Sequence, residues 1–252
     1  MLVPDSESGK SGPERIVYAP VPVLHQGKSC AVIDKPAFLA VEADGPDDVI
    51  KRLSKQLGPP GGRAWPRVVH RLDTGTSGCL CVALNQRGEK ALALGFLEGE
   101  IEKNYLALVR GQVPDQGRFD TAFGPDPKDG RKHTTRIETP RRARLSWKLV
   151  ERFDEAALVR VVLDTGRTHQ IRVHLTHEGH AIVGDEKYGD FALNKSLARG
   201  DVVAGIRFDR MFLHARHLRF THPGTSEVIE LEAPLPAECV ALIHALAKPA
   251  MR

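Results

Sequence analysis

Short runs of β-branched and aliphatic residues recur along the chain, and they constrain its fold more than any other feature. The run NYLALVRGQV, over 104–113, carries apolar side chains on both faces of its first half, which predicts a buried strand. Comparable runs occupy 29–36 and 157–164, and two more flank the turn HPGTSE between 211 and 235. Short connections between neighbouring runs favour antiparallel pairing. The pattern predicts an α+β fold with a mostly antiparallel sheet rather than a doubly wound parallel one.

Apolar residues at helical spacing predict helices between these strands. In the segment 86–100 we expect Ala91, Leu94 and Leu97 on the inner side of the helix. In the segment 166–180, Thr168 is a suitable N-cap and Gly179 a suitable C-terminal stop. The predicted helices lie within 47–57, 86–100, 166–180 and 237–247.

The length of 252 residues suits one large domain. Residues 1–14 are polar and rich in Ser, Gly and Pro, which predicts a disordered lead-in, and we expect 15–252 to form a single domain. The four cysteines show no CxxC spacing, and no secretory signal is visible at the N-terminus. No apolar run approaches the roughly 18 residues of a membrane span. We therefore expect a cytoplasmic monomer without membrane contact.

Positive charge is concentrated in one segment. Residues 126–148 hold eight Lys/Arg and three Asp/Glu, an excess larger than the net charge of +4 of the whole chain. The segment is either a surface that contacts phosphates or a solvated basic loop. Charge by itself does not decide between the two interpretations.

Four histidines, His169, His174, His177 and His180, crowd one stretch and raise the alternative of a metal-dependent hydrolase. The HExxH pattern needs histidines four residues apart on a helix, whereas His177 and His180 are three apart around Gly179. No cysteine or cluster of carboxylates completes a ligand shell there. The chain also lacks the glycine spacings of nucleotide-binding loops and the GxSxG elbow. We therefore expect neither a metal nor a cofactor.

A polar centre, RLDTGTSG over 71–78, separates the apolar runs VVH and CLCVALN. Its residues are good turn formers, so a plain turn between strands is one interpretation. The other is a turn that presents Asp73 for chemistry, because Arg71 lies nearby in the sequence and Arg172 lies on a predicted helix. A lone aspartate with arginines suits a nucleophile or base rather than the paired carboxylates of glycosidases.

These segments resemble the signatures of the RluA family of pseudouridine synthases. HRLDTGTSG, over 70–78, is similar to the family's HRLDxxTSG signature, and GRTHQIRVHL…GHAIVGDEKYG, over 166–189, is similar to its second signature. The chain also contains VIDKP, KNYLALVRG and FLHARHLRFTHP. All five segments stand in the family's order and together cover most of 20–235. On this resemblance the chain is identified as a member of the family.

The resemblance implies the catalytic fold of pseudouridine synthases, a bent, mixed and mostly antiparallel sheet flanked by helices around a central active-site cleft. It implies an isomerase that acts on uridine in ribosomal RNA, above all of the large subunit, or in transfer RNA. The enzyme would cut the glycosidic N1–C1′ bond, turn the uracil and rejoin it through C5, with no cofactor, metal or energy source. The target base would be flipped out of its stack first.

The resemblance also implies roles for single residues. Asp73 matches the catalytic aspartate, Arg172 the arginine that pairs with it, and Tyr105 the tyrosine that packs against the target base. Arg71 matches the arginine that enters the stack where the base has left. In an RNA enzyme the basic segment becomes a candidate for backbone contacts, with Arg141, Arg142 and Arg144 as the proposed residues.

Two positions depart from the family pattern. Thr74-Gly75 stands where a charged or polar pair is usual, and Phe38 stands where glycine is common, which leaves the local turn geometry open. The residues before the first strand are too few for the S4-type module of some members, so we expect the domain to find its RNA unaided. A non-enzymatic RNA-binding or RNA-folding factor with the same fold is the alternative function. The sequence leaves open which uridine and which RNA are modified.

Overall fold

The computed structural model describes residues 19–57, 65–139, 141–201 and 206–247. The expected lead-in of residues 1–14 lies outside these ranges. The helices are α1 (Val49–Leu57), α2 (Gln86–Glu98), α3 (Gln170–His177), α4 (Phe191–Arg199) and α5 (Ala237–Ala247). The strands are β1 (Val23–Gln26), β2 (Cys30–Lys35), β3 (Arg67–Val68), β4 (Ser77–Ala83), β5 (Glu102–Arg110), β6 (Gln116–Ala122), β7 (Gly124–Pro125), β8 (His133–Thr134), β9 (Arg142–Arg152), β10 (Ala156–Leu163), β11 (Leu213–Thr221) and β12 (Val228–Glu232).

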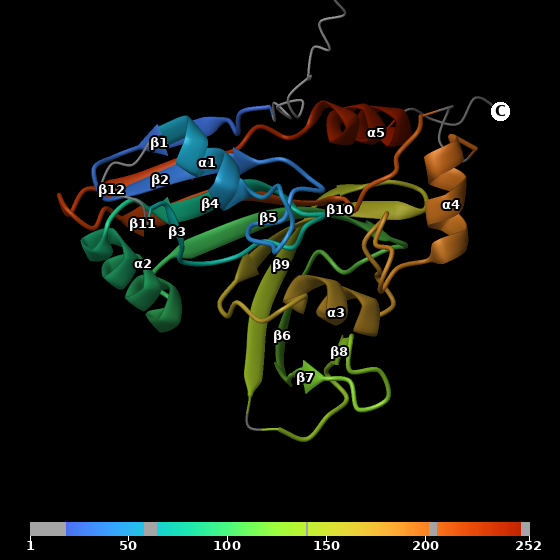
Figure 1. Ribbon diagram of the computed structural model, residues 1–252. Coiled ribbons are helices and arrows are strands. Elements are labelled where there is room, and N and C mark those ends of the chain that lie inside the picture. Colours follow the sequence, from blue (N-terminus) through green and yellow to red (C-terminus); the bar gives the residue numbers. More distant parts are fainter. Residues whose placement is uncertain (1–18, 58–64, 140, 202–205, 248–252) are drawn as a thin grey trace, which may run out of the picture.

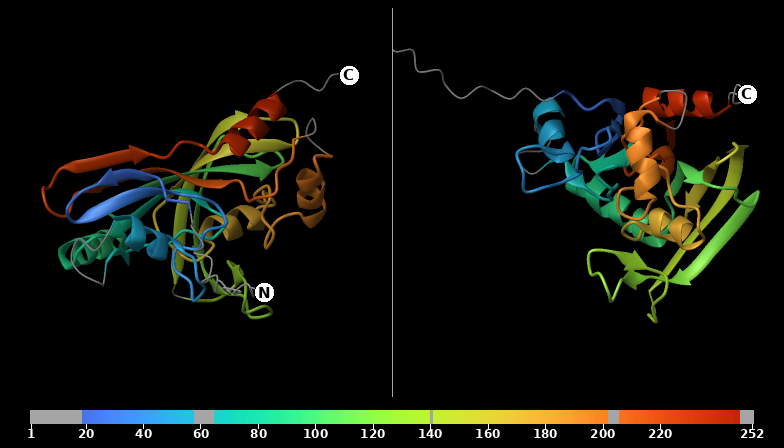
Figure 2. Two further views of the ribbon diagram at one scale, coloured as in Figure 1. Left: turned by 45° about the horizontal axis from the view of Figure 1, so that its top comes forward. Right: turned by 90° about the vertical axis from the view of Figure 1, so that its right-hand side faces the viewer.

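One large mixed sheet organises the described residues, with helices on its sides (Figure 1). Its order is β1-β2-β4-β11-β5-β10-β9-β6, with β12 paired to β11 and β3 to β4, while β7 and β8 form a separate small sheet. The pairs are antiparallel except for β4 with β11. Figures 1 and 2 show β6 and β9 extending away from the remaining strands toward β7 and β8. The predicted α+β class with a bent, mostly antiparallel sheet is confirmed.

The parallel contact between β4 and β11 depends on one glycine. Gly78 pairs with Ala215 and has a φ of 106°, in the left-handed region that favours glycine. A Cβ at this position would lie 2.3 Å from the Ala215 carbonyl oxygen, so a side chain would push the strands apart. Ala215 also pairs with Tyr105 of β5. Strand β11 therefore joins the start of β4 to the middle of β5.

The two faces of β5 serve different cores. Tyr105 and Ala107 belong to a buried cluster that includes residues of α1 and α3. Leu106 and Leu108 point the other way and pack with residues of α4 and α5. The run over 104–113 thus forms the doubly buried strand that its sequence predicts, and α3 lies on the same face as the Tyr105 side chain.

Helix α2 forms where predicted, but the expected inner side is wrong. Ala91, Leu94 and Leu97 are exposed, and Leu97 is 83% exposed. The buried side consists of Gly88, Leu92 and Gly95. A Cβ on Gly88 would lie 1.9 Å from the Ser29 carbonyl oxygen, so the helix approaches the turn between β1 and β2 through this glycine. The apolar spacing identified the helix but not the face that packs.

The N-terminal end of α3 also differs from the prediction. Its N-cap is His169, in the left-handed region with a φ of 58°, and no side-chain hydrogen bond from Thr168 caps the helix. Instead, the Gln170 side chain accepts hydrogen bonds from the Thr165 hydroxyl and the Arg167 N–H. At the other end Gly179 has a φ of 85° and follows the last turn, as predicted.

No helix among the described residues has both the length and the apolar character needed to cross a bilayer.

Candidate active site

An open pocket of about 700 Å³ lies at the ends of several elements. Its walls come from the turn before β4, from β5, from α2, and from the loop that joins β10 to α3. Five of the seven predicted site residues line this one pocket although they are far apart in the sequence: Arg71, Asp73, Tyr105, Arg144 and Arg172.

Asp73 occupies a tight turn immediately before β4. The Thr76 N–H donates to the Asp73 carbonyl oxygen at 3.0 Å, which closes the turn. The Asp73 side chain is 24% exposed, and its Oδ2 accepts a hydrogen bond of 2.9 Å from Arg172 Nη1. Oδ1 forms no hydrogen bond with any described residue. One carboxylate oxygen is therefore fixed and the other remains open to the pocket.

The buried side chain of Lys35 supports the turn that carries Asp73. Its Nζ donates to the carbonyl oxygens of Pro36, Leu39 and Thr74 at 2.7 to 3.2 Å. Burial lowers the pKa of Lys35 to about 7. The three bonds tie the loop after β2 to the residue that follows Asp73.

Phe38 lies in this same loop after β2. Its backbone is left-handed, with a φ of 64°, and its side chain is 63% exposed. The departure from glycine noted in the sequence thus leaves a phenylalanine in a conformation that glycine adopts more readily.

Arg172 is held between two aspartates. Its Nε and Nη2 donate to the two oxygens of Asp185 at 2.7 and 2.8 Å, a bidentate pair, while Nη1 reaches Asp73. Burial would raise the pKa of Asp185, but hydrogen bonds from Arg172 and from the backbone N–H groups of Tyr188 and Lys187 hold this pKa below its usual value. Asp185 thereby fixes the plane of the guanidinium that contacts Asp73.

Tyr188 completes the support of Arg172. The guanidinium carbon lies 5.1 Å from the centre of the Tyr188 ring, within the range of a cation–π contact. The Tyr188 hydroxyl accepts the His133 N–H at 3.0 Å and lies 2.9 Å from His169 Nδ1. Burial lowers the pKa of His169 to about 4, so this pocket histidine is neutral at pH 7.

Tyr105 and Arg71 differ in exposure. Tyr105 is 6% exposed, and burial together with the charge of Asp73 raises the pKa of its phenol, which stays neutral. Arg71 is exposed at the pocket.

His70, just before Arg71, stacks on Phe96 with ring centres 4.1 Å apart. Its Nε2 accepts the Cys81 N–H at 2.9 Å, and burial lowers the pKa of His70 to about 3.

The three arginines predicted from the basic segment take different positions. Only Arg144 lines the pocket. Arg142 forms an ion pair with Asp120 at 3.0 Å, on the neighbouring strand β6. Arg141 is exposed just before β9.

The sequence interpretation assigned no role to Lys35, Asp185 or Tyr188. Each lies in a segment that carried the family resemblance, but only their contacts reveal what they do. A lysine at the end of an apolar strand, and an aspartate thirteen residues after an arginine on a short helix, were the available signals. Both are charges that need partners once buried.

The crowded histidines do not converge among the described residues. His169 faces the pocket, His174 is buried beside Thr121 with its Nε2 2.9 Å from the hydroxyl, and His177 is exposed. The metal-dependent alternative has no ligand cluster in this stretch.

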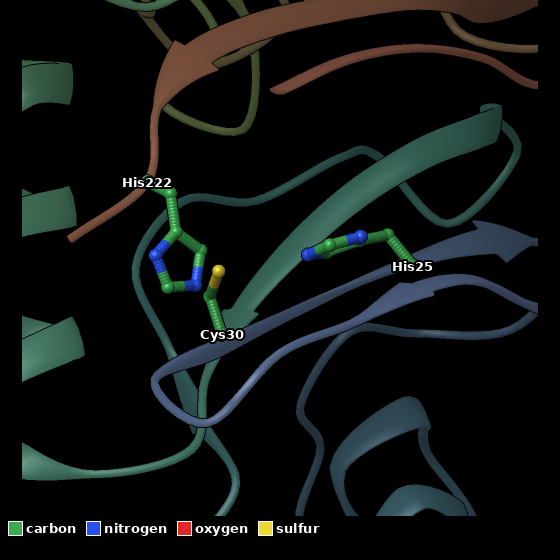
Figure 3. Close-up of side chains that lie close together, drawn as sticks. All are labelled: His25, Cys30 and His222. Carbon is green, nitrogen blue, oxygen red and sulfur yellow. The ribbon is translucent and has the colours of Figure 1, made fainter. Parts of the chain in front are cut away.

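A different group of possible metal ligands lies outside the pocket. Side-chain atoms of His25, Cys30 and His222 lie within 4.8 Å of one another (Figure 3). However, His222 Nδ1 accepts hydrogen bonds from the backbone N–H groups of Gly224 and Thr225, which places the imidazole hydrogen on Nε2. A ligating histidine shows the opposite arrangement, with a free lone pair toward the metal and a donor on the other nitrogen. The trio therefore does not fit a resident metal.

The chain forms a mixed-sheet domain whose open pocket is lined by the carboxylate of Asp73, which is bonded to an arginine. A family model described as RNA pseudouridylate synthase matches residues 29–177. A ribosomal large subunit pseudouridine synthase D of Nitrosomonas europaea is 35% identical over 233 residues, covering 90% of this chain and 65% of that protein. The synthase D of Xanthomonas campestris is 37% identical over 238 residues, covering 92% of this chain and 71% of that protein.

A solved structure gives the same result for the fold. Human RNA pseudouridylate synthase domain containing 1 superposes with a TM-score of 0.70 at 28% identity, covering 91% of this chain and 96% of that one. The chain belongs to the RNA pseudouridylate synthase family, and the resemblance found in its sequence is confirmed. It spans about two thirds of the length of the two bacterial relatives.

Proposed function

We propose that this protein isomerises uridine to pseudouridine within RNA, with Asp73 as the catalytic residue. The observation that carries the proposal is the 2.9 Å bond from Arg172 to one oxygen of Asp73, at the wall of an open pocket, in a chain of this family. Arginine keeps its charge at any physiological pH and its fork matches a carboxylate. Asp185 and Arg172 are the positioning residues that fix where Asp73 Oδ2 lies.

The reaction is an isomerisation, so every heavy atom of the substrate remains in the product and the composition is unchanged. The N1–C1′ bond breaks, the uracil turns in the pocket, and a C5–C1′ bond forms, while the hydrogen on C5 is lost as a proton and N1 takes up a proton. Asp73 acts either by attacking C1′ or by removing a proton from C2′. Both routes need one carboxylate oxygen that is free of protein partners, and Oδ1 has none among the residues that the structure describes. Neither requires a metal or a cofactor.

The pocket walls supply a place for the flipped base. Removing a uridine from its stack costs a few kcal/mol, and stacking on an aromatic ring recovers about 1–3 kcal/mol of this. We assign the ring of Tyr105 to that contact and the exposed guanidinium of Arg71 to the gap that the base leaves. Arg141, Arg142 and Arg144 are proposed to contact the RNA backbone near the pocket.

The substrate class follows from the relatives. The two bacterial proteins are named for the large ribosomal subunit, so large-subunit ribosomal RNA is the first substrate to test and transfer RNA the second. We propose that residues 15–252 act as one catalytic domain, as a cytoplasmic monomer.

The test is pseudouridine mapping of total RNA from a strain that lacks this gene. The strain is complemented with the wild type or with Asp73→Asn, which keeps the shape of the side chain but removes its charge. We expect one or more sites to be restored by the wild type alone, with turnover by the variant at least about 10⁴-fold lower. Binding of the variant to the same RNA, measured by filter retention, is expected to stay within about threefold of the wild type.

Two results would count against the proposal. If Asp73→Asn restores modification, the mechanism is wrong. If no site depends on the gene while the protein still binds RNA, the non-enzymatic RNA-binding factor becomes the better interpretation.

A further inference from the structure

A second hollow, of about 530 Å³, lies on the face of the sheet opposite the active-site pocket. Successive side chains of a strand point to opposite faces, so Tyr105 lines the pocket while its neighbour Asn104 lines the hollow. We call this hollow the reverse-face groove. Its floor is made by Ser146 of β9 and Val162 of β10, which pair directly with each other. Their small side chains leave the space open.

Three cations surround this floor, each from a different strand. Arg118 of β6 pairs with Ser146, and Lys148 of β9 lies directly opposite Arg160 of β10. Like charges directly opposite each other on neighbouring strands destabilise a sheet. The arrangement therefore has an unfavourable electrostatic energy in the isolated protein, which an anion bound between the side chains would relieve.

The three cations are also free of carboxylate partners within the described part of the chain. Arg118, Lys148 and Arg160 are all exposed and form no ion pair there. Arg142 and Arg152 on β9, by contrast, are paired with aspartates. The single carboxylate that lines the groove is Glu102, which accepts a hydrogen bond from the Asn104 amide at 3.0 Å.

Strand β9 contributes residues to both the groove and the active-site pocket. Arg144, Ser146 and Lys148 occupy alternate positions of this strand and so share one face. Arg144 lines the pocket, whereas Ser146 and Lys148 line the groove. Four residues of an antiparallel strand span about 14 Å. Arg144 and Lys148, which line the two different hollows, are therefore about 14 Å apart along β9.

We infer that the reverse-face groove binds the phosphodiester backbone of the substrate RNA, beyond the nucleotides that enter the pocket. This inference rests on the proposed function for the identity of the substrate. Phosphates are the partners that unpaired arginines and lysines on a concave surface recognise best, and the contact is independent of base sequence. The groove holds RNA on the protein while the pocket selects the uridine.

The test is the triple variant Arg118→Gln, Lys148→Gln, Arg160→Gln. Each neutralised phosphate contact contributes about 0.7–0.9 to the slope of log Kd against log salt, so the slope is expected to fall by about 2 to 3. On ribosomal RNA the KM is expected to rise at least about tenfold at low salt, with kcat unchanged, because no changed residue touches the pocket. Removing the opposed like charges leaves the fold intact, which thermal unfolding verifies.

The matched control is Lys28→Gln, Lys195→Gln, Arg207→Gln, which removes the same charge from exposed positions outside the groove and the pocket. The inference is overturned if the groove variant and this control show the same salt slope and the same KM. It is also overturned if kcat falls while the slope stays at the wild-type value. Failure of the proposed function is a separate result, since the wild type would then form no pseudouridine although the salt slopes could still be compared.

Discussion

The active-site pocket and the reverse-face groove are built on the same strands but arrange charge differently. In the pocket, one guanidinium serves two carboxylates, and the Arg172 and Asp185 side chains are only 10% and 0% exposed. In the groove, three cations stand exposed with no ion-pair partner among the described residues. A buried, fully bonded charge holds one position, whereas an exposed and unpaired one adapts to its ligand. The fixed charges of the pocket suit a reaction at one atom of the substrate. The unpaired charges of the groove suit contact with an RNA backbone of any sequence.

The first and largest prediction concerns the buried network around Arg172, which Asp185→Asn disrupts. The change leaves Arg172 largely buried with one carboxylate instead of two, and breaking a buried pair costs about 3–5 kcal/mol of stability. We expect chemical unfolding to report a loss of this size. We also expect kcat to fall by about 10- to 100-fold, because Arg172, which orients Asp73, loses the bidentate contact that fixes its guanidinium.

The control for this prediction is Asp115→Asn, which removes an exposed partner of Arg152. Surface pairs contribute about 0–1 kcal/mol, so this variant should be close to the wild type in both measurements. Equal losses in the two variants would mean that the Arg172–Asp185 pair has no special role.

The second prediction concerns the pocket wall. Tyr105→Ala removes a ring that we assign to the target base, so kcat/KM should fall by about 10- to 100-fold, which corresponds to about 1–3 kcal/mol of stacking. Tyr105→Phe keeps the ring and should retain much of the activity in the same steady-state assay. Equal losses in both variants would assign the role to the hydroxyl group instead.

The smallest effect is an acid sensitivity of stability that arises from buried histidines. The folded pKa of His70 is about 3, below the usual value near 6.5, so the unfolded chain binds more protons between these values. Stability is therefore full above about pH 6.5 and falls on acidification, by up to about 1.4 kcal/mol per pH unit for this one group. The same sign holds for His169, His174 and His214, whose pKa values burial lowers to about 4.

His70→Gln tests this prediction, because glutamine offers an oxygen to the Cys81 N–H but does not titrate. Thermal unfolding between pH 7 and pH 5 should show a shallower loss of stability for this variant than for the wild type. The exposed His244→Gln serves as the control and should follow the wild type. A slope unchanged by His70→Gln would show that this histidine is not the acid-sensitive group.

The sequence predicted β2, β5, β10, β11 and β12, four of the five described helices and the Asp73 turn because local patterns encode them. It predicted no strand for β6 or β9 and no helix for α4. The apolar alternation of β5 and the turn residues of 71–78 needed no knowledge of distant contacts. The packing face of α2 escaped prediction, since two of its buried residues, Gly88 and Gly95, carry no apolar side chain to reveal it. Asp185 and Lys35 escaped for a related reason. Their roles depend on partners that only the folded chain brings near, such as Arg172 in the case of Asp185.

Strand β11 has a consequence for when the protein becomes able to act. It is inserted between β4 and β5, and its Ala215 pairs with both Gly78 and Tyr105. A ribosome makes the Asp73 turn and the Tyr105 strand before it makes the strand that separates them. A nascent or truncated chain that lacks β11 therefore carries all the proposed catalytic residues without a pocket.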